Sequence, residues 1–315
     1  MQNHLEMGPG PRPPMMGAGL RPPREGPPPP ANTDHVKRKF LDVAYAHLSP
    51  TQKLDIYLPD KGKGPFPVIV SIHGGAFMEC DKGDMQVMPM LEGLRRGYAV
   101  VAINYRMSGE AQFPALVHDG KAAVRWIRAN AQRYYFDPNR IAAWGGSAGA
   151  WLANMLGLST GVKELEDLAL GNPEQPSNVQ AVVSWFSPTN FLKMDEQLTA
   201  SGLGPLPDMV HNAADSPESK LLGAQITQIP ERVRAANPET YVTPSAPPFF
   251  LQHGKLDAVV PVQGSILLAA KLEQALKGKV RLELLEEAGH GDPLFETPEN
   301  VKKVLDWLDK QLGRC

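Results

Sequence analysis

The chain has very little cysteine. Cys80 and Cys315 are the only two among 315 residues, and one of them is the last residue. A disulfide framework needs more cysteines, and neither residue stands in the close spacing of a zinc site. We therefore expect no disulfide scaffold and no bound metal.

An excess of charge of one sign is also lacking, because 32 Lys and Arg residues nearly balance 34 Asp and Glu residues. Proteins that bind nucleic acid or an anionic membrane surface usually carry a basic excess. The balance favours a small or neutral partner and argues against nucleic acid. It leaves the oligomeric state open.

No long apolar run is present. The longest uncharged stretch near the middle, residues 141–158, contains four glycines together with Ser147 and Asn154, which suits a buried strand, turn and helix. No N-terminal segment has the charged start, apolar run and cleavage site of a signal peptide. We expect no membrane span, and a protein that is either cytoplasmic or secreted with its signal peptide already removed.

Proline and glycine dominate residues 1–31, a composition that cannot bury a core. We predict a flexible tail over residues 1–31 and one globular domain over residues 32–315. In that domain, two short strands near residues 40–45 and 54–58 come first. Apolar runs then alternate with helical patterns, and these runs fall at residues 68–72, 98–103, 141–144, 181–185, 249–251 and 280–285. This alternation predicts an α/β fold with a mostly parallel, twisted sheet of about eight strands and helices on both faces.

One connection is too long for a simple crossover. Residues 186–245 are rich in proline and contain short helical patterns near residues 219–222 and 231–235. We predict a partly helical insertion over the active site that resembles a lid; the alternative is a segment that only pads the edge of the sheet.

The strongest motif is Gly-Gly-Ser-Ala-Gly at residues 145–149, which fits G-x-S-x-G. It follows a predicted strand and precedes a helical pattern, the setting of a serine displayed on a tight turn. Small residues are needed there because the strained backbone packs closely against its neighbours. Ser147 is therefore the predicted nucleophile.

A second motif, His-Gly-Gly-Ala at residues 73–76, directly follows the strand at 68–72. A glycine loop at this point can bring backbone N–H groups to the negative oxygen of a tetrahedral intermediate. We predict Gly75, Ala76 and Ala148 as the donors of this oxyanion hole. We expect His73 to order the loop and not to act as a base.

A serine nucleophile needs a base, and the base needs an acid that orients it. Asp257 follows the strand at residues 249–251, and His290 follows the strand at 280–285. Both positions lie at the carboxyl edge of the predicted sheet, where ligands bind in open α/β folds. The order serine, acid, histidine is that of α/β-hydrolases. We predict His290 as the base and Asp257 as the acid, and we read His253 as a packed histidine.

These motifs, together with Asn-Tyr-Arg at residues 104–106 and His-Gly-Lys-Leu-Asp at 253–257, resemble the bifunctional feruloyl and acetyl-xylan esterase-like branch of the α/β-hydrolases, near the hormone-sensitive-lipase carboxylesterases. The resemblance covers the chain from about residue 36 onward. It implies hydrolysis of short or aromatic acyl esters, such as acetyl or feruloyl groups on plant polysaccharide. The oxyanion motif departs from three consecutive glycines, so tolerance of bulky alcohols does not carry over.

The expected function is thus that of a serine carboxylesterase without a cofactor, with Phe77, Met78 and Val259 near the substrate. Two alternatives stay open. A serine peptidase of the prolyl-oligopeptidase type shares the triad and the sheet but usually has a large N-terminal domain. A non-catalytic binding protein of the same fold would normally have a broken triad.

Overall fold

The computed structural model describes residues 28–313, so most of the predicted tail lies outside the described residues. Residues 28–31 belong to the predicted tail, yet they lie along the loop at residues 83–85. Pro30 forms an antiparallel bridge with Asp84, and the amide of Ala31 donates to the carbonyl of Gly83 at 2.8 Å. The part of the chain that contacts the domain therefore begins before residue 32.

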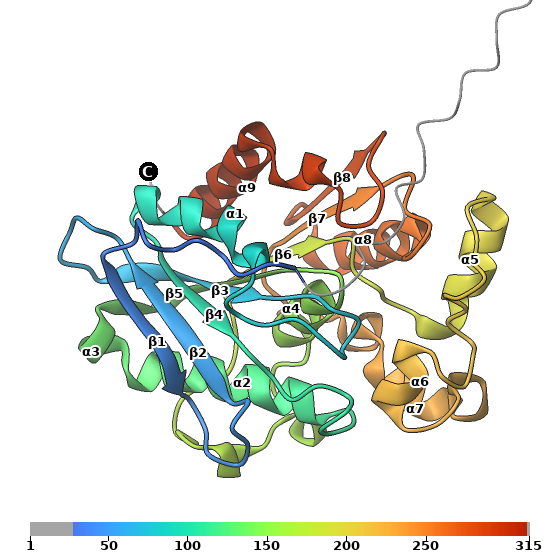
Figure 1. Cartoon of the computed structure of the whole chain (residues 1–315), viewed down its shortest axis with the longest axis horizontal. Coiled ribbons are helices and arrows are strands. Elements are labelled where there is room, and N and C mark those ends of the chain that lie inside the picture. The colour runs from blue at the N-terminus through green and yellow to red at the C-terminus, as the bar shows by residue number, and fades with distance from the viewer. Residues whose placement is uncertain (1–27, 314–315) are drawn as a thin grey trace, which may run out of the picture.

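Within the described residues, eight strands form one sheet in the order β1-β2-β4-β3-β5-β6-β7-β8 (Figure 1). The β2 strand is antiparallel to both of its neighbours, and all pairs from β4 to β8 are parallel. The strands are β1 (Arg38–Ala44), β2 (Lys53–Leu58), β3 (Phe66–Ile72), β4 (Ala99–Ile103), β5 (Phe136–Gly146), β6 (Ala181–Trp185), β7 (Phe249–Gly254) and β8 (Val280–Leu285). The predicted α/β fold with a mostly parallel sheet is confirmed.

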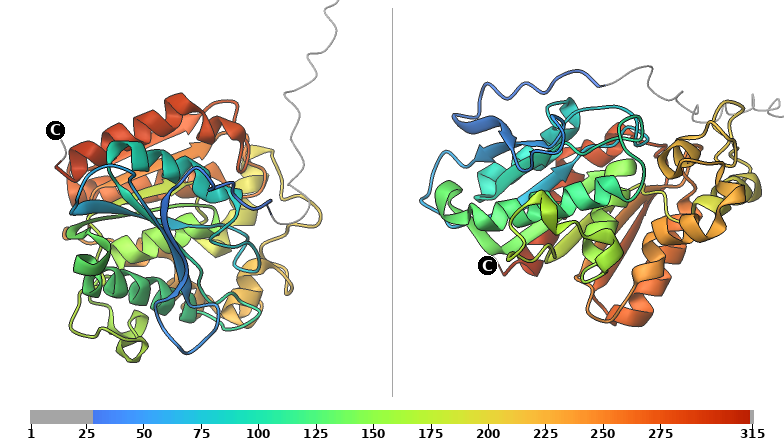
Figure 2. Two further views of the ribbon diagram at one scale, coloured as in Figure 1. Left: turned by 60° about the vertical axis from the view of Figure 1, so that its left-hand side comes forward. Right: turned by 90° about the horizontal axis from the view of Figure 1, so that it is seen from below.

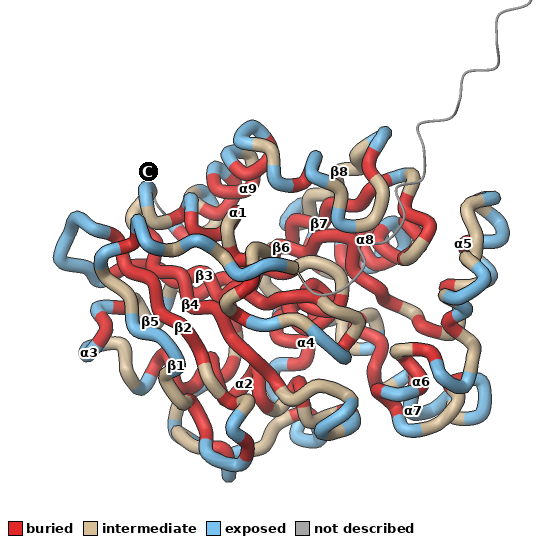
Figure 3. The backbone as a smooth tube through the Cα atoms, in the orientation of Figure 1, coloured by how far each residue is buried: buried red, intermediate tan, exposed pale blue. Residues whose placement is uncertain are grey.

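Helices cover both faces of this sheet (Figure 2). Successive residues of a strand point to opposite faces, and accordingly Val68 and Val70 join one apolar cluster while Ile69 joins the other. Residues of α2 (Ala115–Ala129), α4 (Ala148–Leu158) and α8 (Val262–Leu276) belong to the first cluster. Residues of α1 (Met88–Leu91) and α9 (Pro298–Gln311) belong to the second, and the short α3 (Ala131–Tyr134) follows α2. The central strands are consequently buried on both sides (Figure 3).

The long connection between β6 and β7 contains α5 (Met194–Ser201), α6 (Pro217–Leu222) and α7 (Pro230–Ala236). The α6 and α7 helices lie where the sequence predicted short helical pieces. Phe191, Leu222 and Val233 are fully buried in the first apolar cluster, so this segment packs onto the sheet domain. Its role as a lid stays a prediction.

The parallel strands place the candidate site. The β5, β7 and β8 strands run in the same direction, and Ser147, Asp257 and His290 each follow the carboxyl end of one of them. In residues 28–313, no helix combines the length and the apolar character that crossing a membrane requires.

Candidate active site

Ser147 occupies a sharp turn between β5 and α4. Its backbone has φ 55° and ψ −125°, a strained conformation for a residue with a side chain. The amide of Ser147 donates to the carbonyl of Trp185 at 3.0 Å, which ties the turn to β6. Gly149 presses against the end of β3, because a Cβ atom there would lie 2.1 Å from the carbonyl oxygen of Ile72. The close packing expected for the G-x-S-x-G turn is therefore present.

Three predicted residues form one hydrogen-bonded chain. The Nε2 atom of His290 lies 2.9 Å from the Oγ atom of Ser147, and its Nδ1 atom lies 2.8 Å from Oδ2 of Asp257. Asp257 is fully buried, whereas the side chain of His290 is 20% exposed. The histidine thus spans the distance between a buried carboxylate and a serine hydroxyl at the surface of the site.

Two backbone amides hold the other oxygen of Asp257. Oδ1 accepts from Val259 at 2.9 Å and from Val260 at 2.8 Å. Burial alone would raise the pKa of Asp257, but the charge of His290 and hydrogen bonds from His253 and His290 outweigh it and hold the pKa well below the usual range. Asp257 is therefore an anion at neutral pH.

The His-Gly-Gly-Ala loop lies beside the serine. A Cβ atom on Gly74 would lie 3.3 Å from Cβ of Ser147, and the amide of Gly74 donates to Oε1 of Gln86 at 2.8 Å. In the part of the chain that the structure describes, the amides of Gly75, Ala76 and Ala148 donate to no protein acceptor. These three N–H groups belong to the loop beside Ser147 and to the residue after it, and that they form an oxyanion hole stays a prediction.

His73 lies behind this loop. Its ring is buried and stacks on Tyr105 with the ring centroids 4.6 Å apart, and the Tyr105 hydroxyl donates to the His73 carbonyl at 2.9 Å. Burial lowers the pKa of His73. The ring and the backbone of His73 are thus held by Tyr105, and the ordering role of His73 stays a prediction.

The three residues predicted near substrate differ in position. The Phe77 ring is only 2% exposed and packs edge-on against Trp151, so it fills the core and offers little surface to a substrate. Met78 is 40% exposed. Val259 is half-buried, and its amide holds Asp257.

The sequence did not single out Phe186 or a bonding role for His253. Phe186 follows β6, has φ 40°, and places its ring edge against His290 with centroids 4.9 Å apart. Nε2 of His253 lies 3.2 Å from Oδ2 of Asp257. The position of Phe186 directly after a predicted strand was a signal that could have identified it. The contact of His253 with Asp257 has no such signal, because it depends on how the loop after β7 folds back toward that strand.

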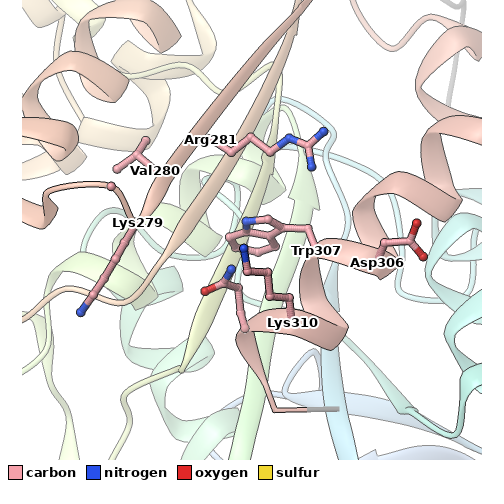
Figure 4. A pocket seen from close by; sticks show the side chains of 8 residues that line it. Lys279, Val280, Arg281, Asp306, Trp307 and Lys310 are labelled. Atoms are coloured by element: carbon pink, nitrogen blue, oxygen red, sulfur yellow. The ribbon is translucent and has the colours of Figure 1, made fainter. Parts of the chain in front are cut away.

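A separate hollow of about 320 Å³ lies elsewhere on the molecule. Figure 4 shows Arg281 of β8 and Lys310 of α9 beside Trp307, with Lys279 just before β8 and Asp306 also at this hollow. The start of a parallel strand is at the opposite edge of the sheet from Ser147. This hollow therefore has no part in the candidate site.

Comparison with known proteins agrees with this geometry. The chain is 31% identical over 242 residues to the probable carboxylic ester hydrolase LipM of Mycobacterium tuberculosis, covering 76% of this chain and 53% of LipM. It is 30% identical to esterase LipQ of the same organism, covering 87% of this chain and 62% of LipQ. The chain thus spans only about half to three fifths of the length of these relatives.

Two solved structures share the fold. A bifunctional GH43-CE protein of Bacteroides eggerthii superposes with a TM-score of 0.79 at 33% identity, over 87% of this chain and 35% of that one. A truncated carbohydrate esterase from gut microbiota superposes with a TM-score of 0.80 at 30% identity, over 90% of this chain and 99% of that one. Residues 54–272 match the BD-FAE family, and the chain is a member of this family of α/β-hydrolases.

Proposed function

We propose that this protein is a carboxylic ester hydrolase that works through an acyl-enzyme on Ser147. The observation that carries the proposal is the chain of hydrogen bonds from Ser147 through His290 to Asp257, at 2.9 and 2.8 Å. A hydroxyl in this arrangement can pass its proton to the imidazole as it attacks a carbonyl carbon.

In the first half of the reaction, Ser147 attacks the ester carbonyl and His290 takes the hydroxyl proton. Asp257 stays ionised and stabilises the imidazolium that forms. The free amides of Gly75, Ala76 and Ala148 are the donors for the carbonyl oxygen as it becomes negative. His290 then gives its proton to the leaving alcohol, and an acyl group remains on Ser147.

In the second half, His290 takes a proton from water, and the resulting hydroxide equivalent attacks the acyl carbonyl. The same amides stabilise the second tetrahedral intermediate. When it collapses, His290 returns a proton to Ser147 and the carboxylic acid leaves. The cycle uses only groups of the chain and water.

For the substrate we propose short acyl esters on a carbohydrate. The names of the two structural neighbours, a GH43-CE protein and a carbohydrate esterase, support this class. A Cβ atom on Gly146, the residue before Ser147, would lie 2.9 Å from the ring of Phe186, so this ring packs closely against the serine turn.

The test is a panel of p-nitrophenyl esters of increasing chain length, with acetylated xylan and methyl ferulate. We expect kcat/KM to be highest for acetyl and propionyl esters and acetate to be released from xylan. A preference for long acyl chains, or for an aminoacyl amide assayed in parallel, would refute the proposed substrate class.

A further inference from the structure

A second histidine contacts the carboxylate of Asp257. His253 lies on β7, four residues before the acid, and is fully buried. Its Nε2 atom is 2.9 Å from the carbonyl oxygen of Val260 and 3.2 Å from Oδ2 of Asp257. On the other side of the ring, Nδ1 is 2.7 Å from Oγ of Ser265 in α8.

The partners of His253 determine which of its ring nitrogens carries a hydrogen. A carbonyl oxygen and an ionised carboxylate both only accept hydrogen bonds, so Nε2 of His253 must carry a hydrogen. The Ser265 hydroxyl serves the other nitrogen and holds the plane of the ring. His253 therefore presents an N–H group between the acid and the backbone of its own loop.

This N–H is shared between the Val260 carbonyl and Oδ2 of Asp257, so N–H groups face both oxygens of the carboxylate. Oδ1 faces the amides of Val259 and Val260, and Oδ2 faces Nδ1 of His290 and Nε2 of His253. A buried carboxylate needs such donors because water does not reach it. If His253 were absent, His290 would be the one group of these four that still faces Oδ2.

We propose that His253 is a positioning residue, which fixes the Asp257 carboxylate and its loop so that Oδ2 points at His290. The proposal rests on the proposed function, since it assigns His253 a role in the same reaction. His253 touches neither substrate nor Ser147, so its effect passes through Asp257. Loss of its N–H leaves the carboxylate free to turn and weakens the alignment of the base.

Three variants separate positioning from general stability. His253→Leu removes the N–H, and His253→Gln keeps an N–H at a similar reach. Gln252→Leu is the matched control: Gln252 is the preceding residue on β7, is equally buried, and bonds to Asn300 through its side chain, on the side away from Asp257. Thermal unfolding of each variant shows whether it folds.

We expect His253→Leu to lower kcat for p-nitrophenyl acetate roughly 10-fold or more, which is the size of effect seen when the hydrogen-bond partner of a metal ligand is removed. KM should stay nearly unchanged. His253→Gln should recover most of the rate, and Gln252→Leu should keep the kcat of the unaltered protein. If His253→Leu turns over as fast as Gln252→Leu, or if His253→Gln is as slow as His253→Leu, the positioning role is wrong.

A second readout does not need turnover. At acidic pH an imidazole holds both ring protons, and the proton between Nδ1 of His290 and Asp257 gives a downfield NMR signal. We expect this signal to move or broaden in His253→Leu and to stay in His253→Gln and Gln252→Leu. An unmoved signal in His253→Leu would overturn the proposal, whereas failure of the unaltered protein to hydrolyse any ester would overturn the proposed function and leave this readout valid.

Discussion

His211, in the long segment between β6 and β7, bonds to the loop that carries the acid. Its Nε2 atom lies 2.8 Å from the carbonyl oxygen of Val259, two residues after Asp257. The same ring faces a carboxylate, with Nδ1 3.1 Å from Oε1 of Glu218. Its backbone amide is held by Oδ1 of Asp195 at 2.8 Å. A buried imidazole therefore links this segment to the loop that contains Asp257 and Val259.

This link predicts a pH-dependent contribution to stability. Burial would lower the pKa of His211, but the hydrogen bond and charge of Glu218, with the Val259 carbonyl and Asp195, raise it above 6.5. A raised pKa means that the folded state binds the proton more tightly, so the stabilisation is present in full below pH 6.5 and is lost as pH rises through the folded pKa.

Glu218→Gln removes the charge that holds this proton. We expect the difference in unfolding free energy between the unaltered protein and the variant to be larger at pH 5.5 than at pH 8.5, as measured by urea unfolding. A difference that is equal at both pH values would show that the His211 proton is not held by Glu218.

A methyl group at the serine turn should not be tolerated. In Gly149→Ala the new Cβ would lie 2.1 Å from the carbonyl oxygen of Ile72 and 2.5 Å from that of His73, so the backbone must move. We expect a loss of about 3 kcal/mol or more in unfolding free energy, together with loss of ester hydrolysis.

Gly109→Ala is the matched control, because a Cβ atom there would meet nothing within 4 Å in the described residues. It should keep both stability and activity. Equal behaviour of the two alanine variants in thermal unfolding would contradict the packing described for the turn.

The contact of residues 28–31 with the loop at 83–85 should stabilise the His-Gly-Gly-Ala loop at residues 73–76. The amide of Ala31 bonds to Gly83, and the amide of Met85 bonds to Pro29 at 2.9 Å. Next to them, Asp84 accepts from the Gln86 amide at 2.9 Å, and Gln86 in turn holds the amide of Gly74. The amide N–H of Ala31 lies at one end of this series of contacts, and a single substitution can remove it.

Ala31→Pro deletes that N–H and suits the proline-rich sequence before it. We expect faster hydrogen exchange at the amides of residues 83–86 and a several-fold lower kcat, with Ala31→Ser unchanged as the control. Unaltered exchange in Ala31→Pro would mean that residues 28–31 do not support the loop.

The fold could be predicted from the sequence because strands buried on both faces leave continuous apolar runs. The sequence predicts that this strand begins at residue 141, whereas in the structure β5 begins five residues earlier, at Phe136. Residues 137–140 are polar and contain a proline, so nothing in their pattern marks a strand, yet Phe136 pairs with Phe66 across a register shift.

The sequence predicted which three residues form the candidate site and their order in the chain. It did not predict which neighbouring side chains are buried or what they contact. Glycine neighbours mark Ser147 and His290 in the sequence, whereas Asp257 is marked by its place after a strand and by its order in the chain. The burial of Phe77 and the contacts of His253 and Phe186 arise between segments that are far apart in the chain or folded back on themselves. Such contacts have no period or spacing for a sequence pattern to detect.

The central claim is that Ser147 carries the acyl group, and the mass of the peptide that contains it tests this most directly. Protein mixed with p-nitrophenyl acetate and quenched in acid during turnover should gain one acetyl group on that peptide. Ser147→Ala should fold, gain no acetyl group, and lose activity by roughly 10⁶-fold, as for other serine hydrolases. A folded Ser147→Ala variant that still hydrolyses the ester at a comparable rate would contradict the account.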